Sequence, residues 1–150
     1  MLTLLAGPSG SGKSVVASRL QGRAVEFDDW VAGRYGGTLQ EAMSAYCGAY
    51  PASRDEFLRH VVREARAGDV VMVDPYVRKQ DRIDLLVRLR GEGIGPLHLV
   101  YLATGFGALQ RRHATRPDYR DEQAVYRLYA EQEFPLPDEG WDSVTILGTG

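Results

Sequence analysis

The sequence predicts an α/β fold in which helices cover both faces of a central parallel sheet. Short apolar runs alternate along the chain with segments of helical periodicity, and this alternation is typical of a parallel sheet. A glycine-rich stretch follows the first apolar run, where the carboxyl end of a strand would offer a ligand site. The length of 150 residues, 44% of them hydrophobic, fits one domain over residues 1–150.

The first half of the chain contains three predicted strands. They are the apolar runs at 2–6 and 24–27 and the mostly β-branched run at 70–73. A helix is expected over 13–21, where Gly22 follows, and another over 38–47. Ser53 and Glu56 form a capping-box pattern, so a third helix should run from there to Ala67 and end at Gly68.

The second half continues the alternation. Apolar residues at Ile83, Leu86 and Leu89 predict a helix over 79–90, and the run at 97–102 predicts a fourth strand. Helices are expected over 105–114 and 121–133, on either side of an arginine-rich turn, and residues 144–147 form a last short strand. The residues that follow each strand should therefore meet at one edge of the sheet.

Composition excludes several classes of protein. The net charge of −2 lacks the basic excess of proteins that track a long nucleic acid, so any such contact should be short. One cysteine excludes an internal disulfide framework. No apolar run approaches the length of a membrane span and no basic-then-apolar leader precedes Leu2, so we expect a cytoplasmic protein with no membrane partner.

The stretch GPSGSGKS matches the phosphate-loop pattern G-x-x-x-x-G-K-[ST] and stands between a predicted strand and a predicted helix. Glycines let backbone N–H groups approach phosphate oxygens, a lysine ammonium neutralises the β and γ phosphates, and the final hydroxyl can ligate Mg²⁺. The predicted nucleotide-binding residues are Gly7, Pro8, Ser9, Gly10, Ser11, Gly12, Lys13 and Ser14.

The rest of the sequence favours a kinase over other nucleotide-binding classes. A guanine-reading N-K-x-D element is absent, which excludes a Ras-type switch. The third strand ends in one acidic residue, Asp74, where mechanical ATPases usually have two. A small kinase needs only the loop, a carboxylate at the acceptor and arginines over the transferring phosphoryl group. A non-catalytic ATP-binding protein remains an alternative.

Carboxylates follow the second and third strands. Asp28 could accept the proton of an acceptor hydroxyl, with Asp29 beside it, although both could instead cap a helix. Asp74 could hold Mg²⁺ through water or position a substrate-binding arginine such as Arg34 or Arg78, although it could also be a turn residue.

Four arginines crowd the turn between the last two predicted helices: Arg111, Arg112, Arg116 and Arg120. Arginines on a segment above the phosphates can close on the nucleotide and stabilise the charge that develops during transfer. The alternative is a solvated turn in which basic residues stand near a helix C-terminus.

Four segments together resemble the kinase domain of the bacteriophage-type 5′-hydroxyl polynucleotide kinases, over most of the chain. They are GPSGSGKS, FDDW, MVDPYVRKQDR and ALQRRHATRPDYRDEQAVYRLYAEQEFPLP. The resemblance implies a three-layer, nucleotide-kinase-like P-loop NTPase fold with a helical, arginine-bearing lid over about 105–133. It also implies that Asp28 is the general base, that Asp74 is functional, and that Arg116, with Arg112 as its partner, clamps the phosphate.

The sequence departs from that family at the acceptor side. The family has an acceptor-binding arginine where this chain has Val31, so Arg34, one turn later, is expected to hold the acceptor phosphate. Trp30 and Tyr35 are candidates to stack on a terminal base, and ordinary core packing is the alternative for Trp30. The phosphate-loop and lid patterns are shared with gluconate, shikimate, adenylylsulfate and zeta-toxin-like kinases.

The sequence therefore predicts a Mg²⁺-dependent kinase that moves the γ-phosphoryl group of ATP to the 5′-hydroxyl end of DNA or RNA. The alternative acceptor is a hydroxyl group of a small metabolite, a nucleoside or nucleotide, or a modified base. Lys13, Asp28 and Arg116 are the expected catalytic residues, and Ser14, with Asp74 through water, is expected to hold Mg²⁺. The expected acceptor-binding residues are Asp29, Arg34, Asp74 and Arg78.

Overall fold

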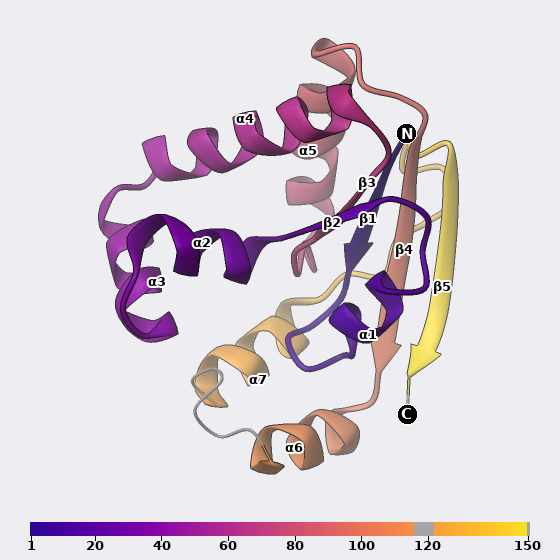
Figure 1. Cartoon of the computed structure of the whole chain (residues 1–150). Coiled ribbons are helices and arrows are strands. Elements are labelled where there is room, and N and C mark those ends of the chain that lie inside the picture. The colour runs from indigo at the N-terminus through magenta and orange to yellow at the C-terminus, as the bar shows by residue number, and fades with distance from the viewer. Residues whose placement is uncertain (116–121, 150) are drawn as a thin grey trace.

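Five parallel strands form the sheet of this computed structural model, which describes residues 1–115 and 122–149 (Figure 1). The strand order is β2-β3-β1-β4-β5. All five predicted strands are present, although β2 ends one residue earlier than expected and β4 extends further. Their bounds are β1 Leu2–Ala6, β2 Arg23–Glu26, β3 Val70–Val73, β4 Leu97–Thr104 and β5 Ser143–Thr149.

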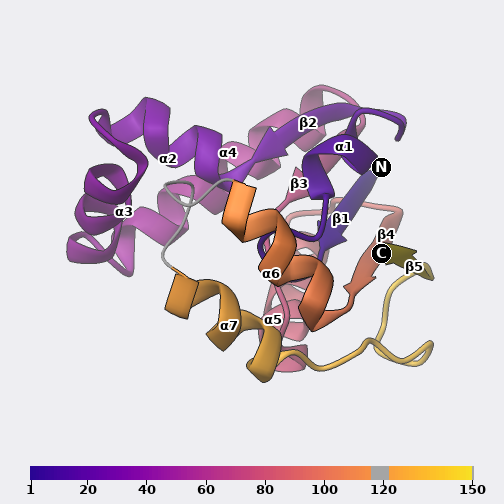
Figure 2. The ribbon, with the colours of Figure 1, turned by 90° about the horizontal axis from the view of Figure 1, so that it is seen from below.

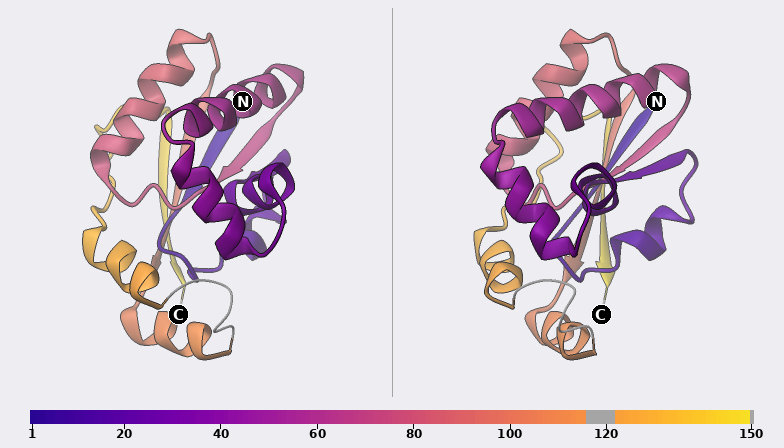
Figure 3. Two further views of the ribbon diagram at one scale, coloured as in Figure 1. Left: turned by 90° about the vertical axis from the view of Figure 1, so that its left-hand side faces the viewer. Right: turned by 60° about the vertical axis from the view of Figure 1, so that its left-hand side comes forward.

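Helices cover both faces of the sheet, as the sequence predicts (Figure 3). Side chains alternate between the faces of a strand, so Leu4 and Met72 pack in the core beneath α4 (Ala52–Ala67) and α5 (Lys79–Gly91). Leu5 and Val73 pack on the opposite face with Ala17 of α1 (Lys13–Ala17). Helix α1 is shorter than expected, because the chain turns away after Ala17.

The capping box lies at a different helix from the one predicted. Thr38 and Glu41 form the capping box of α3 (Leu39–Gly48). Ser53, the predicted cap of α4, lies inside that helix, and its hydroxyl donates to the Tyr46 carbonyl at 2.8 Å. Ser53 therefore joins α4 to α3 instead of beginning α4. Within the described residues, no helix combines the length and apolar character that crossing a bilayer requires.

Three further helices lie toward the carboxyl ends of the strands. Helix α2 (Phe27–Tyr35) continues directly from β2, which brings Asp28 and Asp29 into its first turn. Helices α6 (Phe106–Thr115) and α7 (Glu122–Glu131) lie next to one another below the sheet (Figures 1 and 2). The Phe106 ring packs against Tyr126, with centroids 5.0 Å apart, and holds this predicted lid together.

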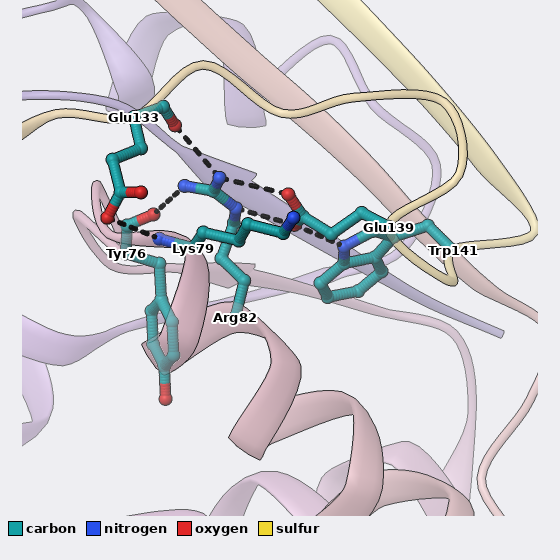
Figure 4. Close-up of polar contacts among 6 residues, drawn as sticks. All are labelled: Tyr76, Lys79, Arg82, Glu133, Glu139 and Trp141. Atoms are coloured by element: carbon teal, nitrogen blue, oxygen red, sulfur yellow. Dashed lines mark hydrogen bonds and ion pairs between the residues drawn. The ribbon is translucent and has the colours of Figure 1, made fainter.

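A buried arginine fastens the segment between α7 and β5 to helix α5 (Figure 4). The side chains of Arg82 and Glu139 are both 0% exposed, and Arg82 Nε donates to Glu139 Oε1 at 2.7 Å. The guanidinium also donates to the carbonyl oxygens of Tyr76, at 2.9 Å, and Glu133, at 2.8 Å. Arg82 thus joins the connection between β3 and α5 to the segment that follows α7, which it contacts at Glu133 and Glu139.

We expect Arg82→Met to lower the free energy of unfolding by about 3–5 kcal/mol, because the change leaves Glu139 buried without its partner. Arg59→Met is the control, since Arg59 is 62% exposed and pairs with Asp55 at the surface, so its cost should stay below about 1 kcal/mol. Urea unfolding of both variants measures the difference. Equal stability of the two variants would contradict a structural role for the buried pair.

Candidate active site

The phosphate-loop residues 7–14 curve between β1 and α1 in a conformation that needs glycine. Gly7, Gly10 and Gly12 have positive φ angles of 140°, 83° and 94°, which side chains other than hydrogen rarely permit. A Cβ atom on Gly7 would lie 2.7 Å from the carbonyl oxygen of Leu102. The backbone of Gly7 also donates to the Pro75 carbonyl at 2.9 Å, which joins the loop to the end of β3.

Two polar side chains of the loop lie where a triphosphate would meet them. Lys13 Nζ donates to the carbonyl oxygens of Gly7 and Pro8, each at 2.9 Å, so the ammonium lies across the loop. Ser14 Oγ donates to Glu26 Oε1 at 2.7 Å. The ammonium and the hydroxyl are thus oriented before any ligand enters.

A first hollow of about 220 Å³ opens beside the loop. Lys13 and Ser14 line it together with Asp28 and Asp29 of α2 and Asp74 at the end of β3. The sequence predicted that these residues, which follow three different strands, would lie together, and the parallel sheet brings them to one edge. The hollow combines a cation for phosphate oxygens with carboxylates that can accept a proton or bind a cation.

Glu26, which the sequence analysis did not single out, also lines this hollow. A hydrogen bond shared with Asp29 and partial burial raise the pKa of Glu26, while the hydrogen bond from Ser14 opposes that rise. The available signal was its place near the end of the predicted second strand, two residues before Asp28; in the sheet, β3 lies between β2 and the strand that carries the loop. Mg²⁺ commonly takes one or two carboxylates together with substrate phosphates and water, and the Ser14–Glu26 contact fits that donor set. Among the described residues there is no cluster of three or more histidine, cysteine, aspartate or glutamate side chains arranged to hold a metal alone.

A second hollow, of about 540 Å³, adjoins the first. Phe27, Asp74 and Pro75 line both hollows and form the wall between them. The far side of the second hollow comes from α3, α4, α5 and α7. A ligand in the second hollow would therefore lie next to a phosphate held at the loop.

The partner of Asp74 is Arg54, another residue that the sequence analysis missed. Arg54 Nη1 lies 2.9 Å from Asp74 Oδ2, and its second terminal nitrogen donates to the Tyr76 hydroxyl. Burial raises the pKa of Asp74 while the charge of Arg54 lowers it. Arg54 precedes the buried Phe57 by three residues, so the two side chains share the buried face of α4. An arginine on that face was the signal that the sequence analysis overlooked.

The structure corrects the predicted partners of the acceptor side. Arg34 donates from Nε to Glu56 at 2.6 Å and lines neither hollow, so it is not positioned for an acceptor phosphate. Arg78 does line the second hollow, where it pairs with Asp81. Neither arginine pairs with Asp74.

The two aromatic residues expected to stack on a base lie elsewhere. Trp30 packs against Phe57, with ring centroids 5.2 Å apart, and Tyr35 packs against Trp30 at 6.4 Å. Neither ring lines a hollow. The alternative of core packing is therefore correct for Trp30.

The predicted lid reaches the phosphate loop through Arg112, whose Nη1 donates to the Gly10 carbonyl at 2.8 Å. A third hollow, of about 440 Å³, lies between the loop, α1 and the two lid helices, and Val16, Leu109 and Val125 supply part of its apolar lining. Its place beside the loop suits the nucleoside part of a nucleotide. Arg116 and Arg120 lie outside the described residues.

Comparison with known proteins gives a family and a set of similar folds. A family model described as "AAA domain" matches residues 2–133. A gluconokinase from Sinorhizobium meliloti 1021 shares 19% identity, with 98% of this chain and 81% of that chain covered and a TM-score of 0.65. A sugar kinase from Janibacter sp. HTCC2649 shares 19% identity, with 99% and 84% covered and a TM-score of 0.68.

A shikimate kinase from Aquifex aeolicus vf5 shares 16% identity, with 97% of this chain and 85% of that chain covered and a TM-score of 0.55. At these identities the likeness concerns the fold, which is that of a nucleotide-kinase-like P-loop NTPase. No curated protein matches the chain.

Gly7→Ala should weaken ATP binding by about tenfold or more, because its Cβ displaces the loop and a lost phosphate hydrogen bond costs about 1.5–3 kcal/mol. Gly33→Ala is the matched control, since a Cβ at Gly33 in α2 meets nothing within 4 Å. That change should leave ATP affinity unchanged and raise stability by up to about 1 kcal/mol. Calorimetric titration with Mg·ATP measures the ATP affinity of the two variants. Wild-type affinity in Gly7→Ala would contradict phosphate binding by this loop.

Proposed function

The chain belongs to the AAA domain family, and from that premise we propose that it is a kinase that moves the γ-phosphoryl group of ATP to a hydroxyl group of a small molecule. The observation that carries this proposal is the pair of adjoining hollows. One contains the phosphate loop and the other is wide enough for an acceptor, and Asp74 lies on the wall that they share. Direct transfer requires donor and acceptor sites in contact with one another.

The donor side of the proposed reaction uses the loop and its neighbours. Backbone N–H groups of residues 7–14 would hold the phosphates, and Lys13 would exchange its carbonyl partners for β and γ oxygens. Ser14, with Glu26 and Asp74 nearby, would hold Mg²⁺. A cation held by these residues would supply positive charge that offsets the charge of the phosphates.

The acceptor side uses Asp28 as the general base. The acceptor oxygen attacks the γ phosphorus, its proton passes to the Asp28 carboxylate, and the bond to the β-phosphate oxygen breaks to release ADP. Arg112, whose guanidinium donates a hydrogen bond to the Gly10 carbonyl, would stabilise the charge of the transferring phosphoryl group. Arg116 is its expected partner in that role. Asp74 would orient the acceptor, since Arg54 holds its carboxylate in place.

Three of the similar structures, a gluconokinase, a sugar kinase and a shikimate kinase, support a small acceptor more than a nucleic-acid end. The ion pair of Arg34 with Glu56, outside both hollows, gives no support to the nucleic-acid phosphate contact expected of Arg34. The 5′-hydroxyl of DNA or RNA stays as the second candidate because of the four segments that resemble polynucleotide kinases. Tyr46 and Tyr50 on the second hollow could stack on its terminal base.

Asp28→Asn should lower the turnover number by about 100-fold or more, which is the scale of general-base catalysis, and leave ATP affinity close to wild type. The exposed Asp138→Asn change, outside the hollows, is the control for loss of one negative charge. ADP release with acceptor present measures turnover, and calorimetry measures affinity. Wild-type turnover in Asp28→Asn would exclude this residue as the base.

A panel of acceptors tests the reaction class. The protein is incubated with γ-labelled ATP, Mg²⁺ and, in turn, gluconate, shikimate, simple sugars, nucleosides and a 5′-hydroxyl oligonucleotide. We expect label to pass to a small hydroxyl compound, identified by mass spectrometry. Label transfer to the oligonucleotide alone would favour the second candidate, and ATP binding without ADP release for any acceptor would favour a non-catalytic protein.

A further inference from the structure

The lining of the second hollow divides into an apolar, ring-bearing part and a charged part. Of its 16 described lining residues, nine are apolar or aromatic and seven are arginines or carboxylates. The apolar part favours an acceptor with a flat or apolar portion over one with a hydroxyl on nearly every carbon, because each hydroxyl that leaves water needs a hydrogen-bond partner. The volume of about 540 Å³ lies within the usual range for ligand sites.

Four of the nine apolar or aromatic lining residues carry an aromatic ring: Phe27, Tyr46, Tyr50 and Tyr76. The Arg54 guanidinium lies 5.3 Å from the centre of the Phe27 ring and 5.1 Å from that of Tyr76, so it already covers part of these two rings. Tyr50 is 63% exposed although it is a large ring, which leaves its surface available to a ligand.

Two ion pairs lie among the charged groups of the hollow. Arg54 pairs with Asp74 at 2.9 Å, and Arg78 pairs with Asp81 at 3.2 Å. Asp84 accepts from Gln80, and Arg127 and Glu131 stand one turn apart on α7. Three arginines against four carboxylates give the described lining a formal charge of −1. An anionic acceptor would find no surplus of positive charge here.

Resting on the proposed kinase function, we infer that the acceptor is an uncharged alcohol that carries a flat unsaturated ring, the class that includes nucleosides and glycosides of aromatic alcohols. The ring packs among Tyr46, Tyr50 and Phe27, and its hydroxyl group reaches the wall at Asp74, next to the phosphate loop. Specificity then comes from stacking and from the absence of surplus charge. Sugar acids and phosphorylated acceptors are excluded by the same lining.

Calorimetric titration at saturating Mg²⁺ and a non-hydrolysable ATP analogue tests this inference, because the nucleotide site is then filled. Matched probes isolate the ring: uridine against ribose, and phenyl β-glucoside against methyl β-glucoside. A third comparison isolates charge: uridine against uridine 3′-monophosphate, which keeps the 5′-hydroxyl group. Gluconate serves as the acidic polyol.

In at least one pair we expect the ring-bearing probe to bind about fivefold or more tightly than its partner without the ring. Uridine 3′-monophosphate should bind no more tightly than uridine. A ring-bearing probe that binds less than fivefold more tightly than its partner in both pairs, gluconate that binds as tightly as the better ring-bearing probe, tighter binding of the monophosphate, or no binding of either ring-bearing probe at millimolar concentration would each overturn the inference.

Variants of one exposed residue locate the stacking surface. Tyr50→Ser should lower the affinity for the ring-bearing probe by about fivefold or more. Tyr50→Phe should bind that probe with wild-type affinity, because the ring and not the hydroxyl makes the contact. Leu136→Ser, 53% exposed and outside the hollow, is the control for loss of an exposed apolar side chain. Unchanged affinity in Tyr50→Ser would contradict the assignment of this ring.

The binding data and the turnover data separate the two proposals. Tight binding of a ring-bearing alcohol with no phosphorylated product would support the acceptor class and contradict the kinase reaction. Phosphorylation of gluconate with no preference for a ring would support the kinase reaction and contradict the acceptor class.

Discussion

The candidate site depends on one buried carboxylate and the cation that neutralises it. Asp74 lies between the two hollows with 9% of its side chain exposed, and Arg54 holds it at 2.9 Å. An unpaired carboxylate at this depth would favour its protonated form. Burial raises the pKa of Asp74, and the charge of Arg54 opposes that rise on the wall between the two hollows. Backbone hydrogen bonds from Asp74 to Leu5 and from Gly7 to Pro75 keep that wall in register with the phosphate loop.

Two arginines hold the chain that follows Asp74. Tyr76 has a φ of 40°, in the left-handed region that side chains other than glycine seldom occupy. Arg54 binds its hydroxyl and Arg82 binds its carbonyl, so the residue is held at both ends. Arg82 also binds the carbonyl of Glu133, just beyond the lid helix α7. Arg82 thus contacts both the connection that lines the second hollow and the end of the predicted lid (Figure 4).

The parts of the fold with a strong local signal were predictable from the sequence. Apolar runs located the five strands, and the glycine pattern located the phosphate loop with Asp28, Asp29 and Asp74 beside it. The second hollow was less predictable, because Arg54 and Tyr50 belong to α4 and to the turn before it and reach the hollow only through tertiary packing. The ion pair of Arg34 with Glu56 was hidden for the same reason. A sequence shows that α2 contains an arginine but not that Glu56 of another helix lies within its reach.

A crystal structure with Mg²⁺ and a non-hydrolysable ATP analogue tests the central claim most directly. The account predicts a γ-phosphate bonded to Lys13, Mg²⁺ on the Ser14 hydroxyl, and an open path from that phosphate past Asp74 into the second hollow. A triphosphate bound away from the loop, or a γ-phosphate closed off from the second hollow with Asp28 turned away, would contradict it.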